Sequence, residues 1–341
     1  MNGPHPARRA PTLDDVARRA GVSLATASRA LNGSTRIVAD SYRDRVLAAA
    51  HELGYAPNLL AQATARGSAR IVSLVVADIA DPYFGQIAAG VTAAAAAEGL
   101  HVMVAVAGRD PRQEEDLLHV LRGQRPRAVI LAGSRFGSEP APGLRREVEA
   151  LTDAGCTVVA LGSGDVGMRA LPVANEEGAR LLARALRARG YDRAVVLGAA
   201  EGLRTSDDRV RGFAAGFVPG GGEIDLHRGG FTRDDGERMM RAVLESDPAP
   251  GTVVFGANDV VAIGAAAAIR AAAREVGADL GVAGFDDIPM ARDVTPGLTT
   301  VRIPLEDIGA AALRLALAED SAPPSAAPAE VVLRGSTPDR R

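Results

Sequence analysis

The chain contains no lysine, no tryptophan and only one cysteine, Cys156, and aromatic residues make up only 3% of its 341 residues. A single cysteine excludes an internal disulfide and a zinc site built on several cysteines, so we expect Cys156 to be a small buried apolar side chain. Because aromatic residues are scarce, the cores must be built from Ala, Val, Leu and Ile. All 39 basic residues are arginine, a bias from which we infer no function.

Long apolar runs are also missing. Residues 1–9 lack the apolar stretch of a secretion signal, and the most apolar runs, such as Ile71–Ala77, have only the length of a strand. The sequence therefore predicts a cytoplasmic protein that does not enter a membrane. A length of 341 residues predicts two or three folded units.

Charge is distributed unevenly along the chain. Residues 1–70 contain ten arginines and five acidic residues, a net charge of +5, whereas the remaining 271 residues carry −8 of the total of −3. A basic segment joined to an acidic one favours nucleic-acid binding at one end only. On charge alone, a solvated charged face explains the pattern equally well.

Residues 12–53 carry the capping pattern of three short helices. Thr12 is a good N-cap residue, acidic residues follow it in the first turn, and Gly21 is placed to end the first helix. Ser23 and Ser41 are placed to cap the second and third helices. Two helices joined by a tight glycine-containing turn, with a third packed behind them, predict a helix-turn-helix.

From Arg70 onward the pattern changes to an alternation of strands and helices. Short β-branched runs without polar alternation predict buried parallel strands. The predicted strands are Ile71–Ala77, Val102–Ala107, Ala128–Ala132, Val158–Leu161, Ala194–Leu197, Ile224–Leu226, Val253–Phe255, Leu280–Phe285 and a last one at Glu330–Arg334. The predicted helices are 85–98, 112–122, 144–154, 177–189, 207–217, 233–246 and 259–275. Two successive blocks of this kind predict two doubly wound subdomains with parallel sheets and a ligand cleft at the carboxyl ends of their strands.

Several motifs resemble those of one known family. The segment Thr12–Asn32, TLDDVARRAGVSLATASRALN, resembles the N-terminal signature of the LacI (lactose-repressor) family. The segments GYAPN (54–58), DIADPYF (78–84), FGAND (255–259), GFDD (284–287), LTTV (298–301) and LRGST (333–337) resemble further landmarks in the family's order. The resemblance covers nearly the whole chain.

The resemblance implies an all-α helix-turn-helix headpiece followed by an α/β sensor of the periplasmic-binding-protein type. The implied parts are the headpiece at 10–57, a hinge at 58–68 and the effector-binding and dimerisation domain at 69–341. Within that domain the N-terminal subdomain is expected at about 70–172 and 303–320, and the C-terminal subdomain at about 173–302 and 328–337.

The second helix of the headpiece is expected to read DNA. Leu24 and Ala25 stand where family members select operator bases; both are apolar and can contact a thymine methyl but cannot form bidentate hydrogen bonds. Arg29 is therefore the candidate for a guanine contact; the alternatives are a phosphate contact or a solvated surface charge. The other candidates for contacts to DNA are Thr12, Ser23, Thr26, Ser28 and Asn32, of which Thr12 and Ser23 could instead act only as helix caps.

The hinge departs from the family pattern. The resemblance places Asn58, Leu60, Ala61 and Thr64 against the minor groove, with Thr64 where a leucine wedge usually stands. Threonine is shorter and carries a hydroxyl, so it is a poor unstacking wedge. We expect a shallower DNA bend; the alternative is that Leu60 or Leu59 takes the role in a shifted register.

The resemblance and the strand ends together predict the effector site. The candidate residues are Asp78, Tyr83, Phe84, Arg209, Phe231, Asn258, Asp259 and Asp286. An arginine among carboxylate and carboxamide groups suits a sugar or another polyol. Tyr83 and Phe84 could instead be core residues, and Asp259 could instead cap its own helix. Asp287 is expected to be structural, and Ala174 replaces an aspartate that is common in the family.

Two other functions fit the sequence less well. A solute-capturing binding protein would need an export signal and no headpiece. An enzyme would need catalytic motifs, and the sequence has no Walker motif, no GxGxxG after a strand, no GxSxG and no metal-spaced histidines. We therefore expect a DNA-binding regulator without enzymatic activity, cofactor or metal, a repressor in the commoner mode of the family. It would bind a palindromic operator as a homodimer and respond to a small effector, expected to be a sugar or a sugar derivative.

Overall fold

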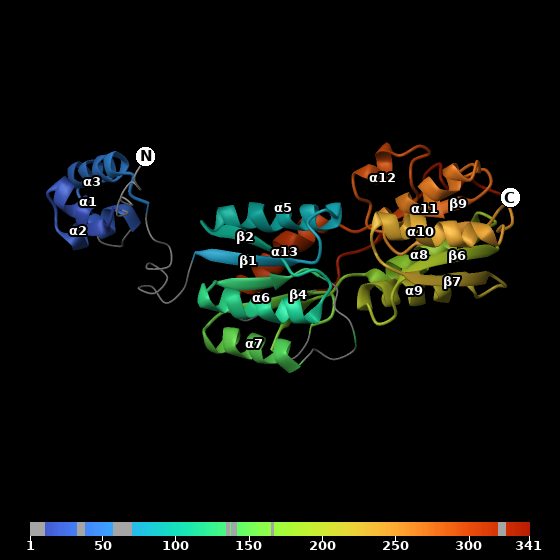
Figure 1. The fold of residues 1–341 in the computed structure, drawn as a ribbon, viewed down its shortest axis with the longest axis horizontal. Helices are drawn as coiled ribbons and strands as arrows, with labels where there is room; N and C mark the ends of the chain where they lie inside the picture. The colour runs from blue at the N-terminus through green and yellow to red at the C-terminus, as the bar shows by residue number, and fades with distance from the viewer. Residues whose placement is uncertain are drawn as a thin grey trace, which may run out of the picture. The chain divides into compact units, whose positions relative to one another are not determined.

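The structure is a computed structural model that describes residues 11–32, 38–56, 70–133, 137, 142–164, 167–319 and 325–341. It divides into two compact units, the headpiece (Met1–Ala69) and the sensor unit (Arg70–Arg341), each described here by itself (Figure 1). In the described ranges, none of the helices has the length and apolar character needed to cross a membrane.

The headpiece contains the three predicted helices, α1 (Leu13–Ala20), α2 (Leu24–Asn32) and α3 (Asp40–Leu53). The Thr12 hydroxyl accepts the Asp15 N–H and the Asp15 carboxylate accepts the Thr12 N–H, so a reciprocal capping box starts α1. Gly21 ends α1 at φ 65°, a backbone angle that favours glycine. The small core is formed by Val16, Ala17, Ala20, Ala27, Ala30, Val46, Ala49 and Ala50.

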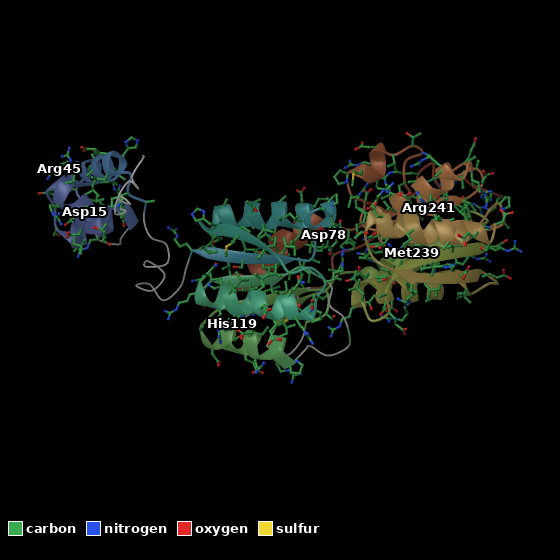
Figure 2. All side chains as sticks on the ribbon, in the orientation of Figure 1. Asp15, Arg45, Asp78, His119, Met239 and Arg241 are labelled. Carbon is green, nitrogen blue, oxygen red and sulfur yellow. The ribbon has the colours of Figure 1, made fainter. Side chains whose placement is uncertain are left out.

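The prediction that Ser41 caps α3 is wrong. The helix begins one residue earlier, at Asp40, and Ala39 stands at the N-cap without a side-chain hydrogen bond. Helix α3 is tied to α1 from the side: Arg45 Nε donates to the Ala20 carbonyl oxygen at 3.0 Å, and Arg45 Nη2 donates to the Gly21 carbonyl oxygen at 3.1 Å (Figure 2). A cation thus satisfies the carbonyl end of α1, where the helix dipole favours positive charge.

The sensor unit contains two parallel sheets. The N-terminal subdomain has strand order β2-β1-β3-β4-β5 and the C-terminal subdomain has the order β7-β6-β8-β9. The strands are β1 (Ile71–Val76), β2 (His101–Val106), β3 (Ala128–Leu131), β4 (Thr157–Leu161), β5 (Arg169–Leu171), β6 (Arg193–Ala199), β7 (Glu223–Gly229), β8 (Val253–Gly256) and β9 (Gly281–Ala283). Two doubly wound parallel sheets confirm the predicted fold class.

Helices cover both faces of each sheet (Figure 1). In the N-terminal subdomain they are α5 (Pro82–Ala97) and α13 (Leu305–Leu317) on one face, and α6 (Pro111–Gly123) and α7 (Pro142–Asp153) on the other. In the C-terminal subdomain they are α8 (Asn175–Ala188) and α9 (Arg204–Phe217), and α10 (Arg233–Glu245) and α11 (Asp259–Ala271). Cys156 is 4% exposed, so it is a buried apolar side chain as predicted.

The chain passes from one subdomain to the other more than once. It enters the C-terminal subdomain after β5 and returns to the N-terminal subdomain as α13, which packs against α5. Between these lie the short helix α12 (Met290–Asp293) and β10 (Thr300–Arg302), and β10 pairs antiparallel with β11 (Glu330–Val332). Strands β5 and β10, of three residues each, were not predicted as strands from the sequence.

Two of the strands expected to be buried lie at sheet edges. Strands β2 and β7 each pair with one neighbour, and side chains such as Val104, Val106 and Leu226 are at least 40% exposed. The prediction of full burial is wrong for these strands because β-branched composition alone does not distinguish an edge strand from a central one.

Pairs of helices approach each other closely at glycines. A Cβ on Gly90 of α5 would overlap the Glu306 carbonyl oxygen of α13, and a Cβ on Gly309 of α13 would overlap the Ile87 carbonyl oxygen of α5. The pair α10 and α11 has the same reciprocal arrangement at Gly236 and Gly264. Backbone therefore packs on backbone at these crossings, which only glycine permits.

Candidate functional site

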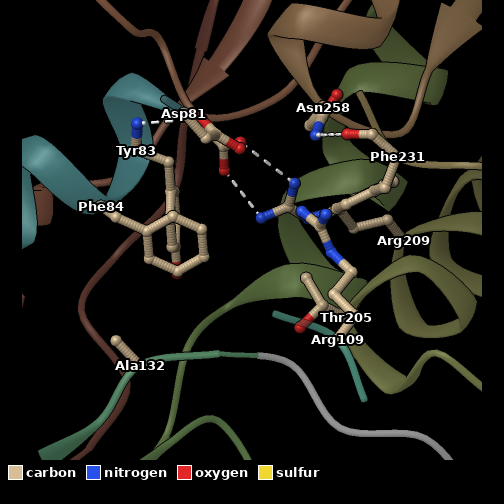
Figure 3. Close-up of a pocket in the computed structure, with 10 residues that line it drawn as sticks. Asp81, Tyr83, Phe84, Arg109, Ala132, Thr205, Arg209, Phe231 and Asn258 are labelled. Atoms are coloured by element: carbon tan, nitrogen blue, oxygen red, sulfur yellow. Dashed lines mark hydrogen bonds and ion pairs between the residues drawn. The ribbon is translucent and has the colours of Figure 1, made fainter. Parts of the chain in front are cut away.

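A cavity lies in the sensor unit between the two subdomains. The lining residues are Asp81, Tyr83, Phe84, Arg109, Ala132, Thr205, Arg209, Phe231, Asn258 and Asp286 (Figure 3).

Each lining residue follows the carboxyl end of a strand. Residues 81–84, 109 and 132 follow β1, β2 and β3, and residues 205, 209, 231, 258 and 286 follow β6, β7, β8 and β9. Both sheets reverse their strand order beside their first strand, and ligands bind at such a switch point in doubly wound folds. Topology therefore brings together side chains that are far apart in sequence.

Arg209 is fixed in the cavity by several hydrogen bonds. It is 1% exposed, and its Nη2 donates to Asp286 Oδ1 at 2.7 Å while Nη1 reaches Asp286 Oδ2 at 3.3 Å. Its Nε donates to Asn175 Oδ1 at 2.9 Å, and Nη1 donates to the Ala257 carbonyl oxygen at 2.8 Å. The guanidinium has five N–H bonds, so one N–H of Nη2 is left over for a ligand.

Asp286 is held in a conformation unusual for its residue type. Its φ is 113°, and the next residue, Asp287, has φ 54°. Asp287 accepts from Arg302 Nε at 2.7 Å and from Arg334 Nη2 at 2.6 Å, which fixes the turn and confirms its expected structural role. Burial raises the pKa of Asp286 to about 7, although the Arg209 charge acts in the opposite direction. Backbone strain of this kind typically marks a binding site.

Aromatic and amide groups complete the walls. The Tyr83 and Phe84 rings meet edge to face, with centroids 5.0 Å apart, and both rings line the cavity while they also pack on the core. Burial raises the pKa of the Tyr83 hydroxyl, so that hydroxyl is a neutral hydrogen-bonding group. Asn258 caps α11 by accepting the Val261 N–H, and its Nδ2 donates to the Phe231 carbonyl oxygen at 3.1 Å.

Two predicted effector ligands do not line the cavity. Asp78 lies just after the end of β1, where its carboxylate accepts the Ala80 N–H, and Asp81 lines the cavity instead (Figure 2). Asp81 occupies that place because it caps α5, which begins at Pro82 and not at the predicted Gly85. Burial raises the pKa of Asp81, and the nearby Arg109 charge opposes that shift.

Asp259 is also outside the lining, and it does not cap its own helix, since Asn258 does. It is fully buried beneath the site, where Oδ1 accepts the Thr300 hydroxyl at 2.6 Å and Oδ2 accepts the Ile288 N–H at 2.9 Å. These hydrogen bonds connect the start of α11, which follows β8, to β10 and to the turn after β9. Arg109, Thr205 and Ala132 belong to the lining but were not predicted, although the strand-end rule that selected the others applies to them too.

The burial of Asp259 predicts an effect of pH on stability. Burial, together with the charge of Asp286, raises its pKa well above the ordinary value. A raised folded-state pKa stabilises the fold at low pH, and this stabilisation is lost as the pH rises from the unfolded pKa through the folded one. We expect the difference in Tm between Asp259→Asn and the wild type to move in favour of the variant between pH 5 and pH 9. A difference that stays constant over this range would contradict the pKa assignment.

The predicted DNA contacts between Thr12 and Arg29 are exposed or half-buried. Leu24 is 50% exposed, and Ala25 and Arg29 also lie on the exposed face of α2. Thr26 is held by Ser23, whose hydroxyl accepts the Thr26 N–H at 3.1 Å, and Ser28 is half-buried. Thr12 is committed to the capping box, and Asn32 is the last residue of α2. The hinge residues Asn58, Leu59, Leu60, Ala61 and Thr64 lie outside the described residues.

Arg29 differs from Arg18, Arg19 and Arg45 of this unit. Arg18 pairs with Asp14, Arg19 pairs with Glu52 at 2.7 Å, and Arg45 binds the end of α1. In the described part of the headpiece, no carboxylate lies within ion-pair distance of Arg29. Its guanidinium is therefore available to an external acceptor such as a base edge or a phosphate.

Comparison with known proteins agrees with this arrangement. The family model described as "Bacterial regulatory proteins, lacI family" matches residues 12–58, and the one described as "Periplasmic binding protein-like domain" matches residues 183–337. The chain is 31% identical over 320 residues to the HTH-type transcriptional regulator CelR of Thermobifida fusca, covering 90% of this chain and 91% of that protein.

Two solved structures resemble the whole chain. The complex of the transcriptional regulator CelR with cellobiose matches with a TM-score of 0.68 and 29% identity, over 96% of this chain and 99% of that one. The Lac repressor dimer bound to operator and the anti-inducer ONPF matches with a TM-score of 0.80 and 25% identity, over 97% and 100%. These matches confirm the resemblance seen in the motifs: the chain belongs to the LacI family of bacterial DNA-binding transcriptional regulators.

Proposed function

We propose that the protein is a repressor that binds a pseudo-palindromic operator as a homodimer and responds to a sugar or sugar derivative in the cavity. The observation that carries the proposal is the cavity itself, in which a buried arginine, two carboxylates and an amide converge beside aromatic rings. Such a set can hold several hydroxyl groups. The CelR–cellobiose complex supports a carbohydrate ligand for this fold.

We propose the same division of the chain that the sequence predicts. Residues 10–57 would bind the operator, residues 58–68 would form the hinge, and the remainder would dimerise and bind effector. One headpiece covers few base pairs, so two would read half-sites about 34–36 Å apart or a compact variant of that spacing. Because its target is genomic DNA, we place the protein in the cytoplasm, at the nucleoid.

Effector would act by changing how the subdomains sit against each other. The cavity is lined from both subdomains, and the chain crosses between them at β5, β10 and α13, so a ligand that favours one arrangement rotates one sheet relative to the other. Coupling between ligand and DNA of this kind is typically about 1–3 kcal/mol.

The test of operator reading uses Arg29. An operator is selected from random DNA with the wild-type protein, and binding is then measured by gel shift for Arg29→Ala. We expect affinity for the selected site to fall by about 1–3 kcal/mol, with relaxed preference at one base pair of each half-site. Arg19→Ala removes the same charge from α1, where Glu52 already pairs with it, and serves as the control. Selection of no palindrome, or equal losses in both variants, would contradict the proposal.

A further inference from the structure

Arg109 is the charged group of the cavity that the proposed function leaves without a role. It lies between the end of β2 at Val106 and Asp110, the N-cap of α6, so it enters the cavity from the N-terminal subdomain (Figure 3). Its guanidinium lies over the Phe231 ring, 5.5 Å from the centroid, and Phe231 belongs to the C-terminal subdomain. Arg109 therefore spans the cavity between the subdomains.

The cavity holds two arginines, and they differ in how their charges are balanced. Arg209 is paired with Asp286 at 2.7 Å. Across the described residues, by contrast, no carboxylate lies within ion-pair distance of Arg109, and no hydrogen bond from its guanidinium is formed. Asp81, the other acid of the lining, uses Oδ1 to accept the Tyr83 N–H at 3.0 Å as the N-cap of α5. Arg109 is thus a half-buried cation that forms no ion pair with the described residues; its charge lowers the pKa of the Asp81 carboxyl, but Asp81 lies beyond ion-pair distance.

From this geometry we propose that the effector carries an anionic group, a carboxylate or a phosphate, which binds the Arg109 guanidinium. The planar fork of arginine matches both groups with two parallel N–H···O bonds. The inference rests on the proposed function, in which Arg209, Asp286, Asn258 and Asp81 hold the hydroxyl groups of the same ligand. The Phe231 ring, 5.5 Å from the guanidinium carbon, adds a cation–π contact that holds Arg109 at the cavity.

The test compares neutral sugars with their acids. The panel contains glucose, glucuronate and glucose 6-phosphate; galactose, galacturonate and galactose 6-phosphate; and ribose with ribose 5-phosphate. Thermal unfolding and release of the selected operator are measured for the wild type, Arg109→Gln and Arg112→Gln. Arg112 is exposed in the first turn of α6, outside the cavity, so its variant makes the same charge change as a control.

We expect at least one acid to bind the wild type ten-fold or more tightly than its neutral parent. Arg109→Gln should remove that preference while leaving affinity for the parent within about three-fold, and Arg112→Gln should retain it. Whether a uronate or a phosphate shows the effect identifies the anion.

The inference is overturned if no acid binds more tightly than its parent, if the preference survives in Arg109→Gln, or if that variant weakens parent and acid equally. The last result would make Arg109 a bridge between subdomains only. Operator release by a neutral sugar, with no preference for acids, would overturn the inference and leave the proposed function intact. Failure to select any operator would instead count against the proposed function.

Discussion

Arg209→Met is expected to lower the free energy of unfolding of the sensor unit by about 3–5 kcal/mol and to abolish the response to effector. The variant leaves the buried Asp286 carboxylate without its counter-charge, which is the costly way to break a buried ion pair. It also orphans Asn175 Oδ1 and the Ala257 carbonyl oxygen. Operator binding should persist, because the headpiece is a separate compact unit with its own core.

The loss of stability in Arg209→Met should depend on pH and on the charge of Asp286. Protonation neutralises a buried carboxylate, so the Arg209→Met protein should be less impaired at pH 5 than at pH 8. Adding Asp286→Asn should restore much of the stability but not the effector response, since both residues line the cavity. Arg211→Met is the control: its exposed pair with Glu176, at 2.9 Å, should be worth less than about 1 kcal/mol. Denaturant unfolding and sugar-induced operator release measure the two effects, and a fully stable, sugar-responsive Arg209→Met protein would refute this account of the site.

Gly90→Ala is expected to destabilise the sensor unit by about 3 kcal/mol, at the upper end of the usual cost of overpacking. The added methyl group would overlap the Glu306 carbonyl oxygen, so α5 and α13 would have to move apart along a face that also includes buried Ile87 and Leu313. Each kcal/mol corresponds to roughly 2–4 °C in a unit of this size, so Tm should fall by about 6–12 °C.

The same helix offers a matched control. Gly85 in α5 is exposed, and a Cβ there would meet nothing within 4 Å. Gly85→Ala should therefore stabilise the protein by about 0.5–1 kcal/mol, because alanine has the higher helix propensity. Opposite signs for the same substitution, five residues apart in one helix, are measurable by calorimetry. If Gly85→Ala and Gly90→Ala lowered Tm by similar amounts, the close approach of α5 and α13 at Gly90 would not be the cause of the loss.

Most of the site could be predicted because a doubly wound fold fixes where ligands bind before any side chain is placed. Arg209, Asn258 and Asp286 were found by that rule together with the family resemblance. The error at Asp78 concerned the choice between two residues about one helical turn apart in the sequence. Asp78 and Asp81 both follow β1, and only the N-capping of α5 by Asp81 decides which of them faces the cavity. Such a choice depends on where a helix begins, which sequence patterns locate only to within a few residues.

Arg109 was missed for a different reason. The strand before it was predicted, but nothing in the sequence around Arg109 distinguishes it from the many surface arginines of this chain. Its significance comes from Phe231, a contact between subdomains that no local pattern encodes. Likewise, the short strands β5 and β10 exist because neighbouring segments pair with them.

The position of α13 in the chain has a consequence for synthesis on the ribosome. The N-terminal subdomain begins at β1, yet one face of its sheet is covered by residues 305–317, which are made after the whole C-terminal subdomain. The described core of the headpiece, by contrast, is formed by residues between 13 and 55. Its local contacts allow it to fold as it emerges, while the sheet waits for a distant helix. A chain halted before Leu317 would therefore carry a finished headpiece joined to an N-terminal subdomain in which one face of the sheet is not fully covered.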